Sequence, residues 1–96
     1  MVEYRVEGEK LTCRFLKRMD TEVCEECESE LFEKIGQVKS ATFDLKDVDY
    51  ISSMFLSICL RASKALGAGN LSIINLHPNV KKVLKIADLD KQVTIE

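Results

Sequence analysis

The sequence predicts an α/β fold: a mostly parallel sheet with an antiparallel strand at its N-terminal edge. Two segments near the N-terminus alternate apolar and polar residues, as the strands of a β-hairpin do. Strand-like segments then alternate with helix-like ones, and one of them, Leu71–Leu76, is almost wholly apolar, as strands inside a parallel sheet are. The expected order of elements is β-β-α-β-α-β-α-β, with right-handed crossovers between the parallel strands.

The first third of the chain predicts a hairpin and a helix. Val2–Val6 and Leu11–Phe15 are the alternating segments, and Gly8 between them can take the positive φ of a tight turn. Asp20 or Thr21 can cap a helix that continues to about residue 35. The apolar residues of this helix fall on one stripe, formed by Val23, Cys24, Cys27, Leu31 and Ile35.

The middle of the chain predicts a buried strand, Ala41–Leu45, followed by a short acidic loop and a second helix. Ser52 or Ser53 can cap this helix, which ends near Gly67. The helix begins where a parallel strand ends, and α/β proteins place their binding surfaces at that edge of the sheet.

The last third predicts a strand, a helix and a final short strand. Leu71–Leu76 is followed by His77 and Pro78, and proline suits the first turn of a helix. Val93–Ile95 has the character of the last strand. The apolar stripe of this third helix comprises Val80, Val83, Leu84 and Ala87.

The composition indicates one domain, residues 1–96, with a cytoplasmic location. The chain is 46% hydrophobic and 31% charged, and its net charge of −2 gives no electrostatic reason to expect nucleic acid or an anionic membrane as a partner. No apolar segment approaches the ~20 residues of a membrane span, and no signal peptide is evident, so direct membrane insertion is not expected. Four cysteines without a secretion signal indicate free thiols in a reducing compartment.

No arrangement of residues indicates catalysis, a metal site or a cofactor, and we expect no enzyme activity. Cys24 and Cys27 form a CxxC motif, but one pair supplies only two zinc ligands, and the only histidine, His77, is distant in sequence. Glu25 and Glu26 disfavour the thiolate that redox chemistry needs, so both cysteines are expected to pack in the core. Motifs of phosphate loops, dinucleotide sites and nucleophile elbows are missing from the sequence.

Two of the predicted helices carry unbalanced charge. The first is acidic, with Glu22, Glu25, Glu26, Glu28, Glu30 and Glu33. The third carries a basic cluster of Lys81, Lys82 and Lys85. A solvated face is the simpler interpretation of both clusters, and docking of an oppositely charged partner is the alternative.

The start of the second helix holds the most informative residues. One serine suffices as a helix cap, so the pair Ser52 and Ser53 leaves one hydroxyl free. Met54 and Ile58 lie four residues apart on a flank of the helix, which is either a half-exposed apolar surface for a partner or the margin of the core. The predicted core side of the helix comprises Leu56, Cys59, Ser63 and Leu66, with Phe55 and Ala62 at its edge. The predicted solvent side comprises Ser57, Arg61 and Lys64.

The chain resembles the STAS domain, the fold of bacterial anti-sigma factor antagonists, over nearly its whole length. Residues 43–53, FDLKDVDYISS, are similar to the strand and loop of the family, and residues 71–91, LSIINLHPNVKKVLKIADLDK, to its following strand, helix start and closing motif. In phosphoregulated members, the loop before the second helix carries a phosphorylatable serine and docks onto an anti-sigma factor that is also a serine kinase. Phosphorylation abolishes binding there, because almost two negative charges enter a fitted interface.

The resemblance places Met54 at the usual phosphoserine and Phe55 at the usual glycine. Met54 has no hydroxyl, so we expect an altered or absent phosphoswitch, with Ser53 and then Ser52 as candidate phosphorylation sites. The resemblance implies that an anti-sigma factor of the serine-kinase type binds the loop and the second helix. The partner-binding candidates are Asp20, Ser52, Ser53, Met54, Phe55, Ser57, Ile58 and Arg61.

Other functions stay open at this point. The same surface would suit an accessory STAS subunit of a lipid-transport ABC assembly, which needs no switch. A nucleotide or small-molecule sensor would use the helix start as an anion site, and a redox enzyme built on the CxxC motif is the least favoured reading. Family members usually add a helix after the last strand, whereas this sequence stops at Glu96. Either the domain is simply shorter, or a partner or second copy, as in a homodimer, occupies that place.

Overall fold

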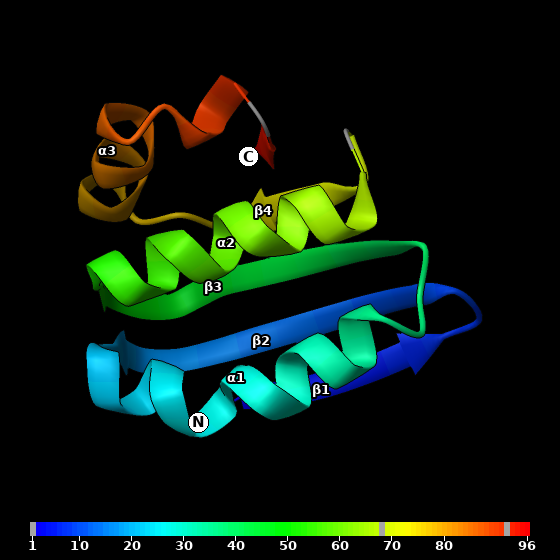
Figure 1. Ribbon diagram of the computed structural model, residues 1–96. Coiled ribbons are helices and arrows are strands. Elements are labelled where there is room, and N and C mark those ends of the chain that lie inside the picture. Colours follow the sequence, from blue (N-terminus) through cyan, green and yellow to red (C-terminus); the bar gives the residue numbers. More distant parts are fainter. Residues whose placement is uncertain (1, 68, 92) are drawn as a thin grey trace.

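Strands and helices follow one another in the predicted order (Figure 1). The computed structural model describes residues 2–67, 69–91 and 93–96. Its strands are β1 (Val2–Glu7), β2 (Lys10–Met19), β3 (Ser40–Ile51), β4 (Leu71–Ile74) and β5 (Thr94–Ile95). Its helices are α1 (Thr21–Ile35), α2 (Ser53–Leu66) and α3 (Pro78–Ile86), and a 3-10 turn, η1, covers Leu89–Lys91.

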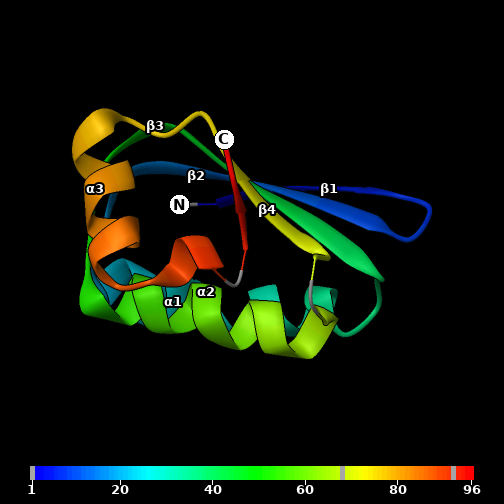
Figure 2. The same cartoon turned by 90° about the horizontal axis from the view of Figure 1, so that it is seen from above.

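The strands form a five-stranded sheet in the order β1-β2-β3-β4-β5. β1 pairs with β2 in antiparallel fashion and the other neighbours pair in parallel, so the predicted fold class is confirmed. Each parallel connection moves to the next strand in the same direction, and right-handed crossovers then place the connecting helices on one face of the sheet. Figure 2 shows α1 and α2 on the same side of the sheet, and the two helices contact each other.

The core lies between the sheet and the helices α1 and α2. β2 alternates buried and accessible side chains, as expected of a strand with one covered face. Three phenylalanines without exposed surface meet at the centre: Phe15 from β2, Phe43 from β3 and Phe55 from α2. The ring of Phe15 meets the other two edge-on, with centroid distances of 5.0 and 5.1 Å. Each such contact adds about 0.5–1.5 kcal/mol to the stabilisation from burial.

β3 is longer than predicted, and the acidic loop expected after Leu45 is part of this strand. β2 is also longer than predicted. The two strands stay paired as far as Met19 and Ile51, through two register shifts. Lys17 takes a φ of 61° in this irregular region. Val48 is fully buried, whereas the charged residues on either side of it are exposed. The bulges break the two-residue alternation, so the sequence pattern does not reveal this part of the strand.

β4 ends two residues earlier than predicted, at Ile74. The next residue, Asn75, adopts a left-handed conformation with a φ of 58°, which asparagine tolerates better than most residues. Its side-chain amide donates a hydrogen bond of 3.1 Å to Asp44 on β3. The chain therefore leaves the sheet before α3, which begins at Pro78 as predicted.

The hydroxyl of Tyr4 is buried between β1 and α1 without a hydrogen-bond partner among the described residues. Burial is the main cause that raises the pKa of Tyr4, and the ammonium of Lys34 lies 5.1 Å from the centre of its ring. Because Tyr4→Phe removes an unpaired polar group and keeps the ring, we expect the free energy of unfolding to stay the same or rise by up to about 1 kcal/mol. Urea unfolding of both proteins measures this. A clear loss of stability would mean that an ordered water pairs with the hydroxyl.

Candidate functional site

The parallel strands end, and the helices begin, at one edge of the molecule. In Figure 1 this edge lies at the left, where β2 leads into α1 and β3 leads into α2. The backbone N–H of Ser52 donates a hydrogen bond of 3.0 Å to the carbonyl of Met19, which ties the two turns together. Asp20 and Ser53, the residues that follow, therefore lie on neighbouring turns.

The two serines of the pair have different environments. Ser52 is 7% exposed, and its Oγ accepts a hydrogen bond of 3.3 Å from the backbone N–H of Phe55, so Ser52 is the cap of α2. The Sγ of Cys24 lies 3.8 Å from the same oxygen. Ser53 is exposed at the first residue of the helix. The hydroxyl that is not needed for capping is therefore that of Ser53, the accessible one of the two phosphorylation candidates.

This difference predicts unequal stability effects for the two serines. We expect Ser52→Ala to lower the free energy of unfolding by about 1–2 kcal/mol, because the first turn of α2 loses its cap. We expect Ser53→Ala to change it by less than about 0.5 kcal/mol, as exposed substitutions usually do. Urea unfolding of the two variants beside the unsubstituted protein tests this. Equal losses would show that both hydroxyls cap the helix.

The buried face of α2 is rotated relative to the face predicted from its sequence. The buried residues are Phe55, Ile58, Cys59, Ala62 and Ser63. Leu56 and Leu66, both assigned to the core side, are only half-buried. The reason lies in the packing: the ring of Phe55 contacts Phe15 and lies 6.5 Å from that of Phe43, and this fixes which side of the helix faces the sheet.

Three of the partner-binding candidates are therefore not at the surface: Ser52, Phe55 and Ile58 are all buried. Phe55 and Ile58 are both 0% exposed. At the flank of Met54 and Ile58, Ile58 packs fully inside and belongs to the margin of the core, whereas Met54 is only partly buried. Met54 and Leu56, both half-buried, are apolar side chains that the start of α2 still presents at the surface.

The other candidates lie at the surface, and two of them already have contacts. Asp20 caps α1, since its carboxylate accepts a hydrogen bond of 3.0 Å from a backbone N–H of the first turn. Arg61 forms an ion pair with Glu28 and lies 5.0 Å from the ring centre of Phe32, so it joins α2 to α1. Ser57 is exposed on α2. Arg61 therefore has a structural role in addition to any contact with a partner.

Sequence reasoning missed an exposed aromatic residue beside the serine pair. Tyr50 is 41% exposed, and the guanidinium of Arg18 lies 4.2 Å from the centre of its ring. A hollow of about 300 Å³ beside Arg18 is lined by Leu16, Lys17, Arg18, Asp20 and Val23. Tyrosine and arginine are, with tryptophan, enriched among the residues that dominate binding energy at interfaces. The available signal was an aromatic residue in an acidic segment, but its exposure depends on the bulged pairing of β2 and β3. We call Arg18, Asp20, Tyr50, Ser53 and Met54 the carboxyl-edge surface.

The thiols are poorly suited to redox or metal chemistry. The free cysteines are Cys13, Cys24, Cys27 and Cys59. Burial raises the pKa of each, to about 12 for Cys13, so the unreactive neutral form prevails near neutral pH. At Cys24 the charges of Asp20 and Glu28 raise the pKa of the thiol further. The sequence predicts this effect from Glu25 and Glu26, the two glutamates inside the CxxC motif. Within the described residues, no group of three or more His, Cys, Asp or Glu side chains is placed to hold a metal ion.

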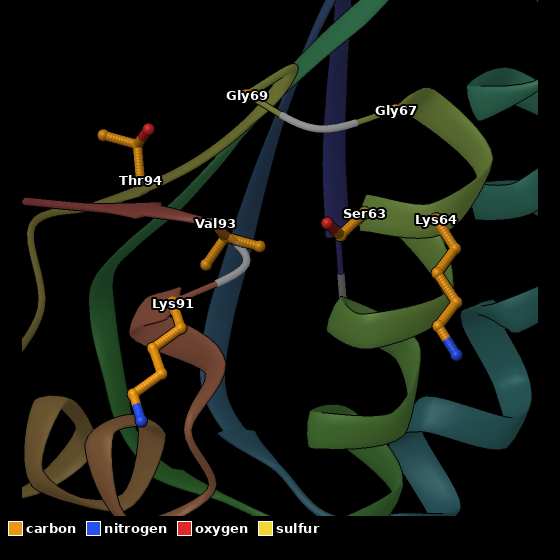
Figure 3. Close-up of a pocket in the computed structure, with 7 residues that line it drawn as sticks. All are labelled: Ser63, Lys64, Gly67, Gly69, Lys91, Val93 and Thr94. Carbon is orange, nitrogen blue, oxygen red and sulfur yellow. The ribbon is translucent and has the colours of Figure 1, made fainter.

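A hollow of about 520 Å³ lies at the other end of α2, far from the serine pair. It is lined by Ser63, Lys64, Gly67, Gly69, Lys91, Val93 and Thr94. In Figure 3 the ammonium groups of Lys64 and Lys91 lie on opposite sides and point away from Ser63. Lys91 also pairs with Asp88 at 3.7 Å. Because these polar groups do not converge, the hollow is a weaker candidate than the carboxyl-edge surface.

No helix in the described parts of the chain is long and apolar enough to cross a membrane.

The chain is similar to known proteins along its length. The family profile for the STAS domain matches residues 2–96. No curated protein has a significant sequence match. Among solved structures, the anti-sigma factor antagonist SpoIIAA in its unphosphorylated form has a TM-score of 0.87 and 18% identity, over 100% of this chain and 88% of that chain.

Two further solved structures share the same fold. The Bacillus cell fate determinant SpoIIAA in its phosphorylated form has a TM-score of 0.79 and 18% identity, over 100% of this chain and 91% of that chain. A putative anti-sigma factor antagonist from Thermotoga maritima, TM1081, has a TM-score of 0.86 and 19% identity, over 98% of this chain and 84% of that chain. At these identities the likeness establishes the fold.

Proposed function

Because the chain belongs to the STAS domain family, we propose that it is an antagonist of an anti-sigma factor. In this role it regulates transcription by binding a cytoplasmic anti-sigma factor of the serine-kinase type, which then releases its sigma factor. The observation that carries the proposal is the family match over residues 2–96, joined to an exposed surface where α2 begins. The function needs binding alone and no reaction catalysed by this chain.

The carboxyl-edge surface supports this role through its composition. Met54 is apolar and half-buried, and it stands directly after the exposed Ser53. Tyr50 stacked under Arg18 offers a flat, rigid contact that loses little conformational freedom on binding. Asp20 adds a negative charge on the neighbouring turn. We propose that Met54, Tyr50 and Arg18 provide most of the binding energy, with the charged and polar residues at the rim.

We further propose that any phosphoswitch in this chain acts through Ser53. SpoIIAA, which shares the fold, has been solved in unphosphorylated and phosphorylated forms. In this chain Ser53 is exposed, whereas the hydroxyl of Ser52 is used to cap α2. A phosphate on Ser53 brings almost two negative charges next to Met54 and near Asp20, which opposes docking by repulsion and by desolvation.

A kinase assay tests this assignment. The purified chain is incubated with ATP and the switch kinase that is recovered with it from its native cells, and phosphate is located by mass spectrometry. We expect the wild-type chain to be phosphorylated, Ser53→Ala to lose the modification, and Ser57→Ala, an exposed serine on the same helix, to keep it. An unmodified chain that still binds the kinase tightly would be a constitutive antagonist. A chain that neither binds nor is modified would contradict the antagonist function.

One observation favours a second function. Met54 occupies the position where phosphoregulated relatives are expected to carry serine, and a structural subunit needs no switch at that position. The same surface would then hold the ATPase subunit of a lipid-transport ABC assembly. Affinity purification from native cells, followed by identification of the bound proteins, distinguishes the two. Recovery of permease and ATPase subunits with no kinase would favour the accessory subunit.

A further inference from the structure

α3 presents a second surface that the proposed function does not use. Lys81, Lys82 and Lys85 lie within about two turns of the helix. A hollow of about 500 Å³ is lined by Pro78, Lys81, Lys82, Lys85 and Ile86, which we call the α3 surface. Ile86 is 74% exposed, and the neighbouring Val83 is 37% exposed although the sequence assigned it to the buried stripe. The exposed aliphatic side chain of Ile86 beside these cations gives the surface both an apolar contact and positive charge.

In the described parts of the chain the lysines of α3 form no ion pair, as is also true of Lys10, Lys17, Lys46 and Lys64, but on α3 three such cations lie close together on one helix. Elsewhere on the surface, ion pairs join Arg5 to Glu7, Arg14 to Asp47, Lys39 to Glu9, Arg61 to Glu28 and Lys91 to Asp88. Lys81 and Lys85 are four residues apart and Lys82 and Lys85 three apart, so their like charges disfavour the helix. The helix dipole accounts for Lys85, which lies in the last turn, but not for the earlier two.

We propose that the α3 surface binds an acidic amphipathic helix of a partner protein. An apolar side chain of that helix would enter the hollow and contact Ile86. Carboxylates on either side of it would pair with Lys82 and Lys85, which are both exposed. This is helix-in-groove recognition, in which apolar anchors provide the affinity and the charges set the orientation.

Two other occupants fit the α3 surface less well. The net charge of −2 opposes the approach of the whole protein to an anionic membrane. A second copy of the chain offers the acidic helix α1, but the exposed face of α1 has no large apolar side chain to contact Ile86. The exposed residues of α1 are Thr21, Glu22, Glu25, Glu26, Ser29, Glu30 and Glu33.

Titration of the ¹⁵N-labelled full chain with a synthetic peptide tests the proposal. The probe is an amphipathic helical peptide with leucines at positions i, i+3, i+4 and i+7 and glutamates elsewhere. We expect saturable chemical-shift changes confined to the α3 surface. The double variant Lys82→Glu/Lys85→Glu is expected to weaken binding at least about tenfold, and Ile86→Ser by about fivefold or more. Lys10→Glu, an exposed charge reversal on β2, is expected to leave it unchanged.

Several outcomes would overturn the proposal. One is the absence of saturable shifts on α3 at millimolar peptide. Another is loss of binding in the lysine variant with no effect of Ile86→Ser, which would indicate non-specific charge attraction. Binding to vesicles of phosphatidylserine and phosphatidylcholine but not to the peptide would assign the surface to a membrane. Concentration-dependent shifts on both α1 and α3 without peptide would assign it to a second copy. None of these results depends on the anti-sigma partner, so the test is independent of the proposed function.

Discussion

Replacing Phe55 with alanine is expected to lower the free energy of unfolding by about 3–5 kcal/mol. The side chain has no exposed surface, and its ring contacts Phe15 edge-on with a centroid distance of 5.1 Å. Truncation leaves a cavity at the junction of β2, β3 and α2, where the surrounding rings relax only in part. Small domains have unfolding free energies of about 5–15 kcal/mol, so this loss is a large share of the total. Guanidinium unfolding monitored by circular dichroism measures it.

Two further substitutions make this result specific. Phe55→Leu keeps most of the apolar volume, and we expect it to lose clearly less stability than the alanine variant. Ser53→Ala, two residues earlier and exposed, serves as the surface control. A loss below about 1 kcal/mol for Phe55→Ala would contradict its placement in the core. If the placement is correct, reduced partner binding in a Phe55 variant reports a disturbed fold and does not identify a contact residue.

Replacing Met54 with glutamate is expected to weaken binding to the proposed anti-sigma partner at least about 100-fold. Met54 is half-buried at the start of α2, next to the exposed Ser53. In a docked complex the new carboxylate would be desolvated near Asp20, which already places a negative charge on the neighbouring turn. The substitution therefore imitates the electrostatic effect proposed for phosphate on Ser53. Isothermal titration calorimetry with the partner that co-purifies from native cells measures the change.

A matched control separates a lost contact from a general effect of added charge. Val6 on β1 is 54% exposed and belongs to the hairpin, so Val6→Glu makes the same kind of change away from the carboxyl edge. We expect Val6→Glu to leave the affinity within about twofold of the wild-type value. Unfolding of both variants checks that the fold is kept. Equal affinity of Met54→Glu and the wild-type chain would place the partner elsewhere on the molecule.

Local sequence patterns determine the secondary-structure elements of this protein and the residues that cap its first two helices. Alternation of apolar residues predicts the hairpin, and apolar stripes with capping residues predict the three helices nearly to their ends. Asp20 and Ser52 cap α1 and α2 because side-chain oxygens satisfy backbone N–H groups within a few residues, an interaction that any sequence window contains. The ordered motifs that resemble the STAS domain also follow from sequence, and the family match confirms that resemblance.

Contacts between segments distant in sequence determine how far β3 extends and which side chains of β3 and α2 are exposed. Bulged pairing with β2 turns the expected acidic loop into the end of β3, and it exposes Tyr50 under Arg18. The ring of Phe55 fixes the rotation of α2, which buries Ile58 and leaves Leu56 half-buried. Helical periodicity defines an apolar stripe only to within about one residue's rotation of 100°, and strand pairing depends on a partner more than thirty residues away. Local sequence therefore specifies the elements, whereas the shared core decides which of their side chains reach the surface.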